Sequence, residues 1–175
     1  HGPKGIGLLF AKSNIQLTSL IRGGGQERGK RAGTENLPSI IGLATALKDA
    51  QEHMQQNTAY ITGLRDALRN GLDKIDGAGF NGSREHCLPG TVNYSFQGVN
   101  GETLLSLLSN EGICCSSGSA CSAGSLEPSH VLLALGLSHE TAKSALRFSL
   151  CEYNTMDEVQ TIITKVTEAV NRLRR

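Results

Sequence analysis

The sequence has 175 residues and a formal net charge of +1, from 17 basic and 16 acidic side chains. This balance argues against a general polyanion binder, and 4% aromatic residues without tryptophan argue against base-stacking surfaces for nucleic acid. No run approaches the roughly 18 apolar residues of a membrane-spanning helix. Five cysteines without a regular spacing fit a reducing cytoplasm better than a disulfide scaffold.

The first third of the chain combines a predicted strand with a glycine-rich loop. Residues 5–12 (GIGLLFAK) predict a short buried strand after a Gly/Pro turn. Residues 21–33 form a basic loop without periodicity, in which free backbone N–H groups, Arg28, Arg31 and the hydroxyl of Thr34 could hold a phosphate. The loop lacks the Gly-Lys-Ser/Thr of a Walker motif, so an ordinary surface loop is the alternative interpretation.

A long helical connector follows. Asn36 is placed to cap a helix that accommodates Pro38 in its first turn, and helical periodicity continues or restarts as far as Gly71. A connector of this length predicts a hinge between two domains, at residues 1–48 and 49–175.

The remainder alternates short strands with helices. We expect strands at 91–96, 113–115 and 145–150, and helices at 101–108, at 127–135 and from a capping box at Thr155 onward. The helices are too few to cover both faces of a sheet, which predicts an α+β layer domain from about residue 50.

Cys121 lies in a run of ten residues, 116–125, that are all Ser, Gly, Ala or Cys. Such a segment restricts its backbone little and buries little apolar area, whereas cysteine is usually among the most buried residues. One interpretation is a nucleophilic thiol on a swinging arm that reaches on the order of 15 Å. The other is a flexible linker that happens to contain a cysteine.

The neighbouring cysteines favour a structural role. Cys114 and Cys115 end an apolar stretch, where buried thiols are expected. The spacing of Cys115 and Cys121 matches no standard zinc pair, and no histidine lies at ligand spacing nearby, which argues against a zinc site.

Arg147 interrupts the apolar strand LRFS and shares a face with Ser149, opposite Phe148. An arginine at such a position is costly unless it is paired. Either an internal carboxylate or a bound anion is therefore expected beside it.

Four stretches together resemble the C-terminal part of a cysteine desulfurase of the NifS/IscS type, within the class-V aminotransferases that use pyridoxal phosphate. They are HGPKGIG at the start, GGGQERGKRAGTEN at 23–36, SSGSACSAGSLEPSHVLLALG at 116–136 and LRFS at 146–149. The resemblance implies an α/β fold, the C-terminal part of a fold-type I transferase. A remnant of the large cofactor domain (1–48) would be joined by a long helix to a small α+β domain (49–175) with a mobile cysteine loop at 116–126.

The resemblance also implies roles for individual residues. Cys121 would take sulfur from L-cysteine, leaving alanine and a persulfide, and Arg147 would bind the substrate carboxylate. Thr34 would bind the cofactor phosphate of the neighbouring protomer in a homodimer. A cytoplasmic iron–sulfur scaffold or other acceptor protein would receive the sulfur, with Cys121 as a transient cluster ligand.

One departure from the family pattern concerns activity. The family's Schiff-base lysine lies in a His-Lys pair just upstream of His1, so the chain begins too late to contain it, and Lys4 belongs to the following turn. The chain therefore looks like a processed or cut piece that is inactive alone. A non-enzymatic sulfur carrier or scaffold-docking module is the rival hypothesis, and an inactive structural fragment is a third. Cys151 replaces a frequent glycine and has no assigned role.

Overall fold

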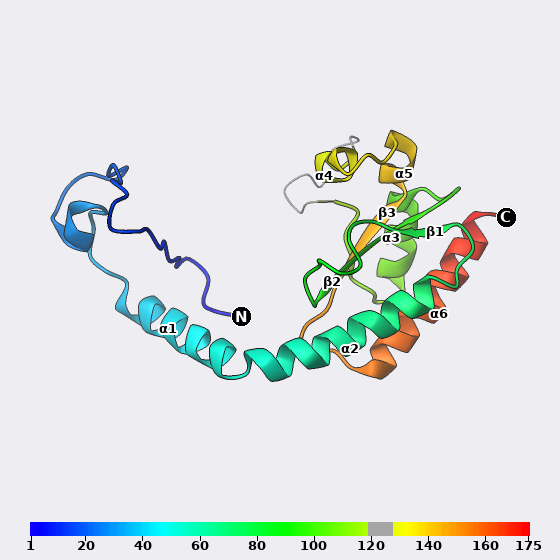
Figure 1. Ribbon diagram of the computed structural model, residues 1–175, viewed down its shortest axis with the longest axis horizontal. Helices are drawn as coiled ribbons and strands as arrows, with labels where there is room; N and C mark the ends of the chain where they lie inside the picture. The colour runs from blue at the N-terminus through cyan, green and yellow to red at the C-terminus, as the bar shows by residue number, and fades with distance from the viewer. Residues whose placement is uncertain (119–127) are drawn as a thin grey trace. The chain divides into compact units, whose positions relative to one another are not determined.

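The structure is a computed structural model that describes residues 1–118 and 128–175. The chain divides into two compact units, His1–Met54 and Gln55–Arg175. Figure 1 shows the elements in chain order.

The first unit contains a 3-10 turn, η1 (Gln26–Gly29), and one long helix, α1 (Leu37–Glu52). The predicted cap is confirmed, because the side chain of Asn36 accepts a hydrogen bond from the Ser39 amide at 3.3 Å. Within η1, Glu27 and Arg28 adopt left-handed backbone angles, with φ of 48° and 58°. None of the 54 residues of this unit is buried.

The prediction of a strand at residues 5–12 is wrong. The segment is neither a strand nor buried, and Leu8, Leu9 and Phe10 are 75%, 74% and 83% exposed. A strand exists only where a neighbour takes its backbone hydrogen bonds, and no described segment pairs with this one.

The second unit contains a three-stranded antiparallel sheet in the order β1-β2-β3. The strands are β1 (Ala78–Phe80), β2 (Thr91–Phe96) and β3 (Ala145–Ser149). The expected strands at 91–96 and 145–150 are confirmed, whereas β1 lies in a segment without a predicted strand, because three residues carry no readable alternation. The segment 113–115 is not a strand: Ser116 makes an isolated bridge to Arg147 at the edge of β3.

Five helices complete the described part of this unit: α2 (Met54–Leu72), α3 (Gly101–Asn110), α4 (His130–Ala134), α5 (His139–Lys143) and α6 (Met156–Leu173). The capping box of α6 is confirmed, with the Glu158 amide 3.2 Å from the Thr155 hydroxyl and the Glu158 carboxylate 2.9 Å from the Thr155 amide. Helix α4 begins later than the expected residue 127, because Ser129 still has the non-helical ψ of 121°.

One face of the sheet carries the main core. Helices α2, α3 and α6 bury their apolar residues against Val92, Tyr94 and Phe96 of β2 and against Leu146 and Phe148 of β3. Helices α4 and α5 lie on the other side of the sheet (Figure 1), where Leu132 and Ala142 pack on Ala145. The mixed α/β character expected from the sequence is confirmed. Among the described residues, no helix has the length and apolar content that a bilayer crossing requires.

A charged cluster fixes the loop between β1 and β2 to α2. Arg84 donates to both carboxylate oxygens of Asp73 at 2.8 Å, and the hydroxyl of Tyr94 donates to Asp73 Oδ1 at 2.8 Å. The Arg84 guanidinium is the main cause that lowers the pKa of Asp73 below its ordinary value. Burial, followed by the hydrogen bond to Asp73, raises the pKa of Tyr94.

Candidate active site

Arg147 lies in the middle of β3, on the face of the sheet opposite the main core. Its cross-strand partner is Asn93, and its sequence neighbours Leu146 and Phe148 are buried in that core. The side chain of Arg147 is half-buried. Among residues 1–118 and 128–175, none forms a hydrogen bond or an ion pair with its guanidinium. Of the two expected partners, no internal carboxylate is found among the described residues.

The free edge of β3 holds the residues that lead to Cys121. The Arg147 amide donates to the Ser116 carbonyl at 2.7 Å, and the Ser116 amide donates back to the Arg147 carbonyl at 3.1 Å. The Ser116 hydroxyl then donates to the Gly118 carbonyl at 2.7 Å, which closes a short turn. Cys121 itself lies outside the described residues, so its role stays a prediction.

The two thiols just upstream differ from each other. Cys115 packs against the main core, and burial, with a smaller contribution from Cys114, raises the pKa of its thiol to about 11. Cys114 is exposed, so the expectation that it is buried is wrong. Successive side chains of an extended segment point to opposite sides, so only one of this pair faces the core. Cys151 is half-buried and has no disulfide partner among the described residues.

Thr34 lies in the first unit, exposed, at the end of the glycine-rich loop and two residues before the cap of α1. The loop is held by a hydrogen bond of 3.2 Å from the Gly33 amide to the side chain of Gln26. Arg28 and Arg31 are also exposed. A hydroxyl, guanidinium groups and the start of a 16-residue helix are each of a donor type that binds phosphate.

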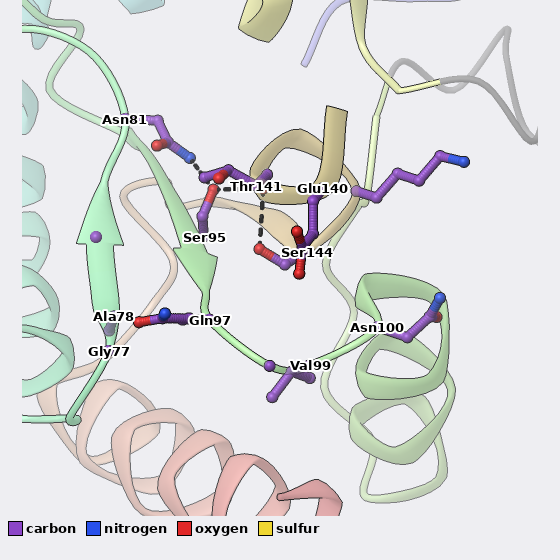
Figure 2. A pocket seen from close by; sticks show the side chains of 13 residues that line it. Gly77, Ala78, Asn81, Ser95, Gln97, Val99, Asn100, Glu140, Thr141 and Ser144 are labelled. Carbon is purple, nitrogen blue, oxygen red and sulfur yellow. Dashed lines mark hydrogen bonds between the residues drawn. The ribbon is translucent and has the colours of Figure 1, made fainter. Parts of the chain in front are cut away.

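The sequence reasoning missed a polar network on the same face of the sheet as Arg147. The Asn81 side-chain amide donates to Asn93 Oδ1 at 2.7 Å and to the Ser95 hydroxyl at 2.8 Å. Ser95 donates in turn to the Thr141 carbonyl on α5 at 2.9 Å, and Ser144 donates to the same carbonyl at 2.9 Å. Figure 2 shows part of this network. The alternation of TVNYSF was the available signal, since it places Asn93 and Ser95 together on the face away from the core.

A cavity of about 770 Å³ adjoins the network (Figure 2). Asn81, Ser95, Gln97, Glu140 and Ser144 are among its lining residues, whereas neither Arg147 nor Thr34 lines it. The described residues contain no group of three or more His, Cys, Asp or Glu side chains that could hold a metal ion.

Comparison with known proteins identifies the family. The class-V aminotransferase family matches residues 1–162. The chain belongs to this family. A cysteine desulfurase of Gluconacetobacter diazotrophicus is 45% identical over 175 residues, which is 99% of this chain and 44% of that relative. The chain therefore spans less than half the length of the curated relatives it matches.

Solved structures carry the same fold as this chain. A NifS-like protein superposes with a TM-score of 0.87 at 38% identity, over 98% of this chain and 44% of that one. SspA, solved in complex with cysteine, is 33% identical with a TM-score of 0.51, over 81% of this chain and 38% of that one. The resemblance to cysteine desulfurases inferred from the sequence is confirmed.

A class-V enzyme that uses pyridoxal phosphate needs a lysine for the cofactor aldehyde, and the lysines of this chain offer a poor fit. Lysine becomes a nucleophile near neutral pH when burial or neighbouring cations lower its pKa. Six of the seven lysines are exposed. The seventh, Lys165, pairs with Glu111 at 3.1 Å, which raises the pKa of its ammonium. The lysines present therefore do not fit the bond to the cofactor aldehyde, whereas the donor types of the basic loop match its phosphate.

Proposed function

We propose that this chain is the sulfur-accepting part of a cysteine desulfurase, which converts L-cysteine to L-alanine and leaves a persulfide on Cys121. The observation that carries the proposal is the half-buried guanidinium of Arg147, which has no partner among the described residues and adjoins the segment leading to Cys121. Its relatives are named cysteine desulfurases, and one related structure contains cysteine.

Arg147 binds the carboxylate of L-cysteine in this proposal. A guanidinium presents two parallel N–H donors that match the two oxygens of a carboxylate, and partial burial strengthens the pair. Leu146 and Phe148, which flank Arg147 on β3, are buried in the core. This burial fixes the strand and therefore the position of the Arg147 guanidinium. Binding at this point orients the substrate relative to the start of the Cys121 segment at Ser116.

Cys121 acts as the nucleophile. Its thiolate sulfur forms a bond to the substrate sulfur while the bond between that sulfur and the substrate Cβ breaks, and Cβ gains a proton to give alanine. Pyridoxal phosphate, when bound, accepts the electron pair that makes this bond cleavage possible. Small residues on both sides let the thiol reach an acceptor protein such as an iron–sulfur scaffold, where Cys121 would serve as a transient cluster ligand.

The first unit has a separate role in the proposal. Thr34 and its basic loop bind the cofactor phosphate, in the site of a neighbouring protomer of a cytoplasmic homodimer. Residues 1–48 then belong to a large cofactor domain of the fold-type I class, and residues 49–175 form the small domain. Every residue of the first unit is exposed or half-buried, which supports the proposal that this unit packs within a larger domain.

The lysines lead us to propose that this chain is inactive alone. We expect no stoichiometric covalent capture of pyridoxal phosphate at any single lysine, because six of the seven are exposed and Lys165 pairs with Glu111. Borohydride reduction followed by peptide mass mapping measures this directly. Stoichiometric labelling of one lysine would contradict the proposal.

The central test uses the longer desulfurase of which we propose this chain to be a part, called the intact protein below. It compares the intact protein with its Cys121→Ser variant, both supplied with pyridoxal phosphate and L-cysteine. We expect matched amounts of alanine and sulfide from the intact protein with a thiol reductant, and loss of both in the variant. Undiminished sulfide release by the variant would remove Cys121 from the mechanism. Sulfur uptake by Cys121 from a persulfide donor, without alanine formation by the intact protein, would instead favour the sulfur-carrier hypothesis.

A further inference from the structure

We propose that Asn93 is a second hydrogen-bond donor to the carboxylate that Arg147 binds, and so helps to determine specificity for an amino-acid substrate. The inference rests on the proposed function, which assigns that carboxylate to Arg147. Asn93 belongs to a different strand from Arg147, and no sequence motif of the chain points to it.

The sheet register places the two side chains next to each other. Asn93 on β2 lies directly opposite Arg147 on β3. The amide of Phe96 donates to the carbonyl of Ser144, so that pair is hydrogen-bonded, and alternation makes Asn93 and Arg147 a non-hydrogen-bonded pair. Side chains of such a pair approach most closely, with Cβ atoms about 4.5–5.5 Å apart. Both side chains are half-buried and lie on the face away from the main core.

The network behind Asn93 fixes which way its amide points. The Thr141 carbonyl can only accept, so the single hydroxyl proton of Ser95 is committed to it. Ser95 must then accept from Asn81, which identifies the shared atom of Asn81 as its nitrogen. The second proton on that nitrogen goes to Asn93, whose facing atom is therefore the oxygen Oδ1.

This orientation leaves the Asn93 nitrogen, Nδ2, on the other side of its carboxamide. Among the described residues, no acceptor takes either of its protons. The nearest cross-strand neighbour is Arg147, which is itself only a donor. Two adjacent donors that share no acceptor among residues 1–118 and 128–175 define a place for an anion, and a carboxylate has enough lone pairs for both.

A purely structural role for Asn93 does not explain why its N–H donors have no acceptor among the described residues. Asparagine is disfavoured in strand interiors, and the network from Asn81 to Thr141 uses only the oxygen of Asn93. A variant that keeps this oxygen but removes the N–H donor therefore separates the two roles. Asn93→Asp is such a variant, because it still accepts from Asn81 while it repels a carboxylate and pairs with Arg147 itself.

The test uses the intact protein with pyridoxal phosphate and L-cysteine. We expect Asn93→Ala to raise KM about tenfold with kcat within about twofold, and Asn93→Asp to raise KM further, as loss of one hydrogen bond to a charged group predicts. The matched control is Thr91→Ala, on the same strand and face but opposite Ser149, which should leave KM unchanged. Inhibition by L-alanine should weaken in both Asn93 variants, whereas inhibition by ethylamine, which lacks the carboxylate, should not change.

The outcomes separate this inference from the function it rests on. If Arg147→Ala raises KM strongly but both Asn93 variants keep the KM and alanine inhibition of the unmodified protein, the inference is wrong and the proposed function stands. If Arg147→Ala also leaves KM unchanged, the carboxylate assignment itself is wrong. Thermal unfolding of Asn93→Asp close to that of the unmodified protein shows that the kinetic change does not come from a disturbed sheet.

Discussion

The two faces of the three-stranded sheet differ sharply although they share the same short strands. On one face Val92, Tyr94 and Phe148 are at most 3% exposed and pack against helices α2, α3 and α6. On the other face Asn93 and Arg147 are half-buried and keep donors without partners among the described residues. Strand alternation thus separates the residues that stabilise the domain from those proposed to bind the substrate.

The difference between the two faces indicates where a ligand can bind. The side chains of the apolar face are covered by the helices that pack on them, so none of them is accessible to a ligand. Helix α5 covers the polar face at Ala145 and Ser95, two register positions from Arg147 and Asn93. Helix α5 therefore covers the cross-strand pair Ser95 and Ala145 but not the next pair on this face, Asn93 and Arg147, which forms the proposed site.

The largest predicted effect compares neighbours on β3. Phe148→Ala should lower the free energy of unfolding by about 3–4 kcal/mol, because it leaves a cavity in the core. Arg147→Ala should change it by less than about 1 kcal/mol, since no described contact of its guanidinium is lost. Urea unfolding of both variants measures the difference. Equal losses in the free energy of unfolding would mean that the polar face contributes as much to stability as the apolar face.

A smaller effect tests a polar contact made from the apolar face, the hydrogen bond from the Tyr94 hydroxyl to Asp73. Asp73→Asn should cost about 1–2 kcal/mol at pH 7, because it weakens the bonds from Arg84 and Tyr94. The pKa of Asp73 is lowered in the folded state, so its contribution is present above the unfolded value near 3.8 and lost as pH falls below it.

The stability gap between Asp73→Asn and the unmodified protein should accordingly close on acidification below pH 3.8, as followed by urea unfolding across pH. A gap that stays constant down to low pH would show that the carboxylate charge contributes nothing. Glu85→Gln, at an exposed position next to Arg84, is a suitable control for the loss of one acidic side chain.

The smallest effect leaves stability unchanged and compares Cys114 with Cys115. Iodoacetamide should label exposed Cys114 about tenfold faster than Cys115 at about pH 8, because burial raises the Cys115 pKa to about 11 and the thiolate is the reactive form. Peptide mass mapping of a time course gives both rates. Comparable rates would place both thiols on the solvent side.

Local signals predicted most of the second unit. The alternation of TVNYSF and the capping box at Thr155 each depend on a few adjacent residues, and both are found in the structure. The strand expected at residues 5–12 failed because pairing requires a distant neighbour that composition does not reveal. Strand β1 was missed because three residues are too few for a pattern.

The candidate site was predictable only in part. Arg147 stood out because one charge interrupts an apolar strand, and the structure leaves that charge without a described partner. The alternation of TVNYSF places Asn93 on the polar face, but its link to Arg147 could not be predicted, because that link depends on the register of two strands about 50 residues apart. Its orientation depends on Thr141, which a further element brings to the network.

The most direct test of the account locates the sulfur. The intact protein is incubated with pyridoxal phosphate and L-cysteine without reductant, capped with an alkylating reagent and mapped by mass spectrometry. We expect one added sulfur atom on the peptide containing Cys121, and none on those containing Cys87, Cys114, Cys115 or Cys151 alone. Alanine formation with the added sulfur on another cysteine, or on none, would contradict it.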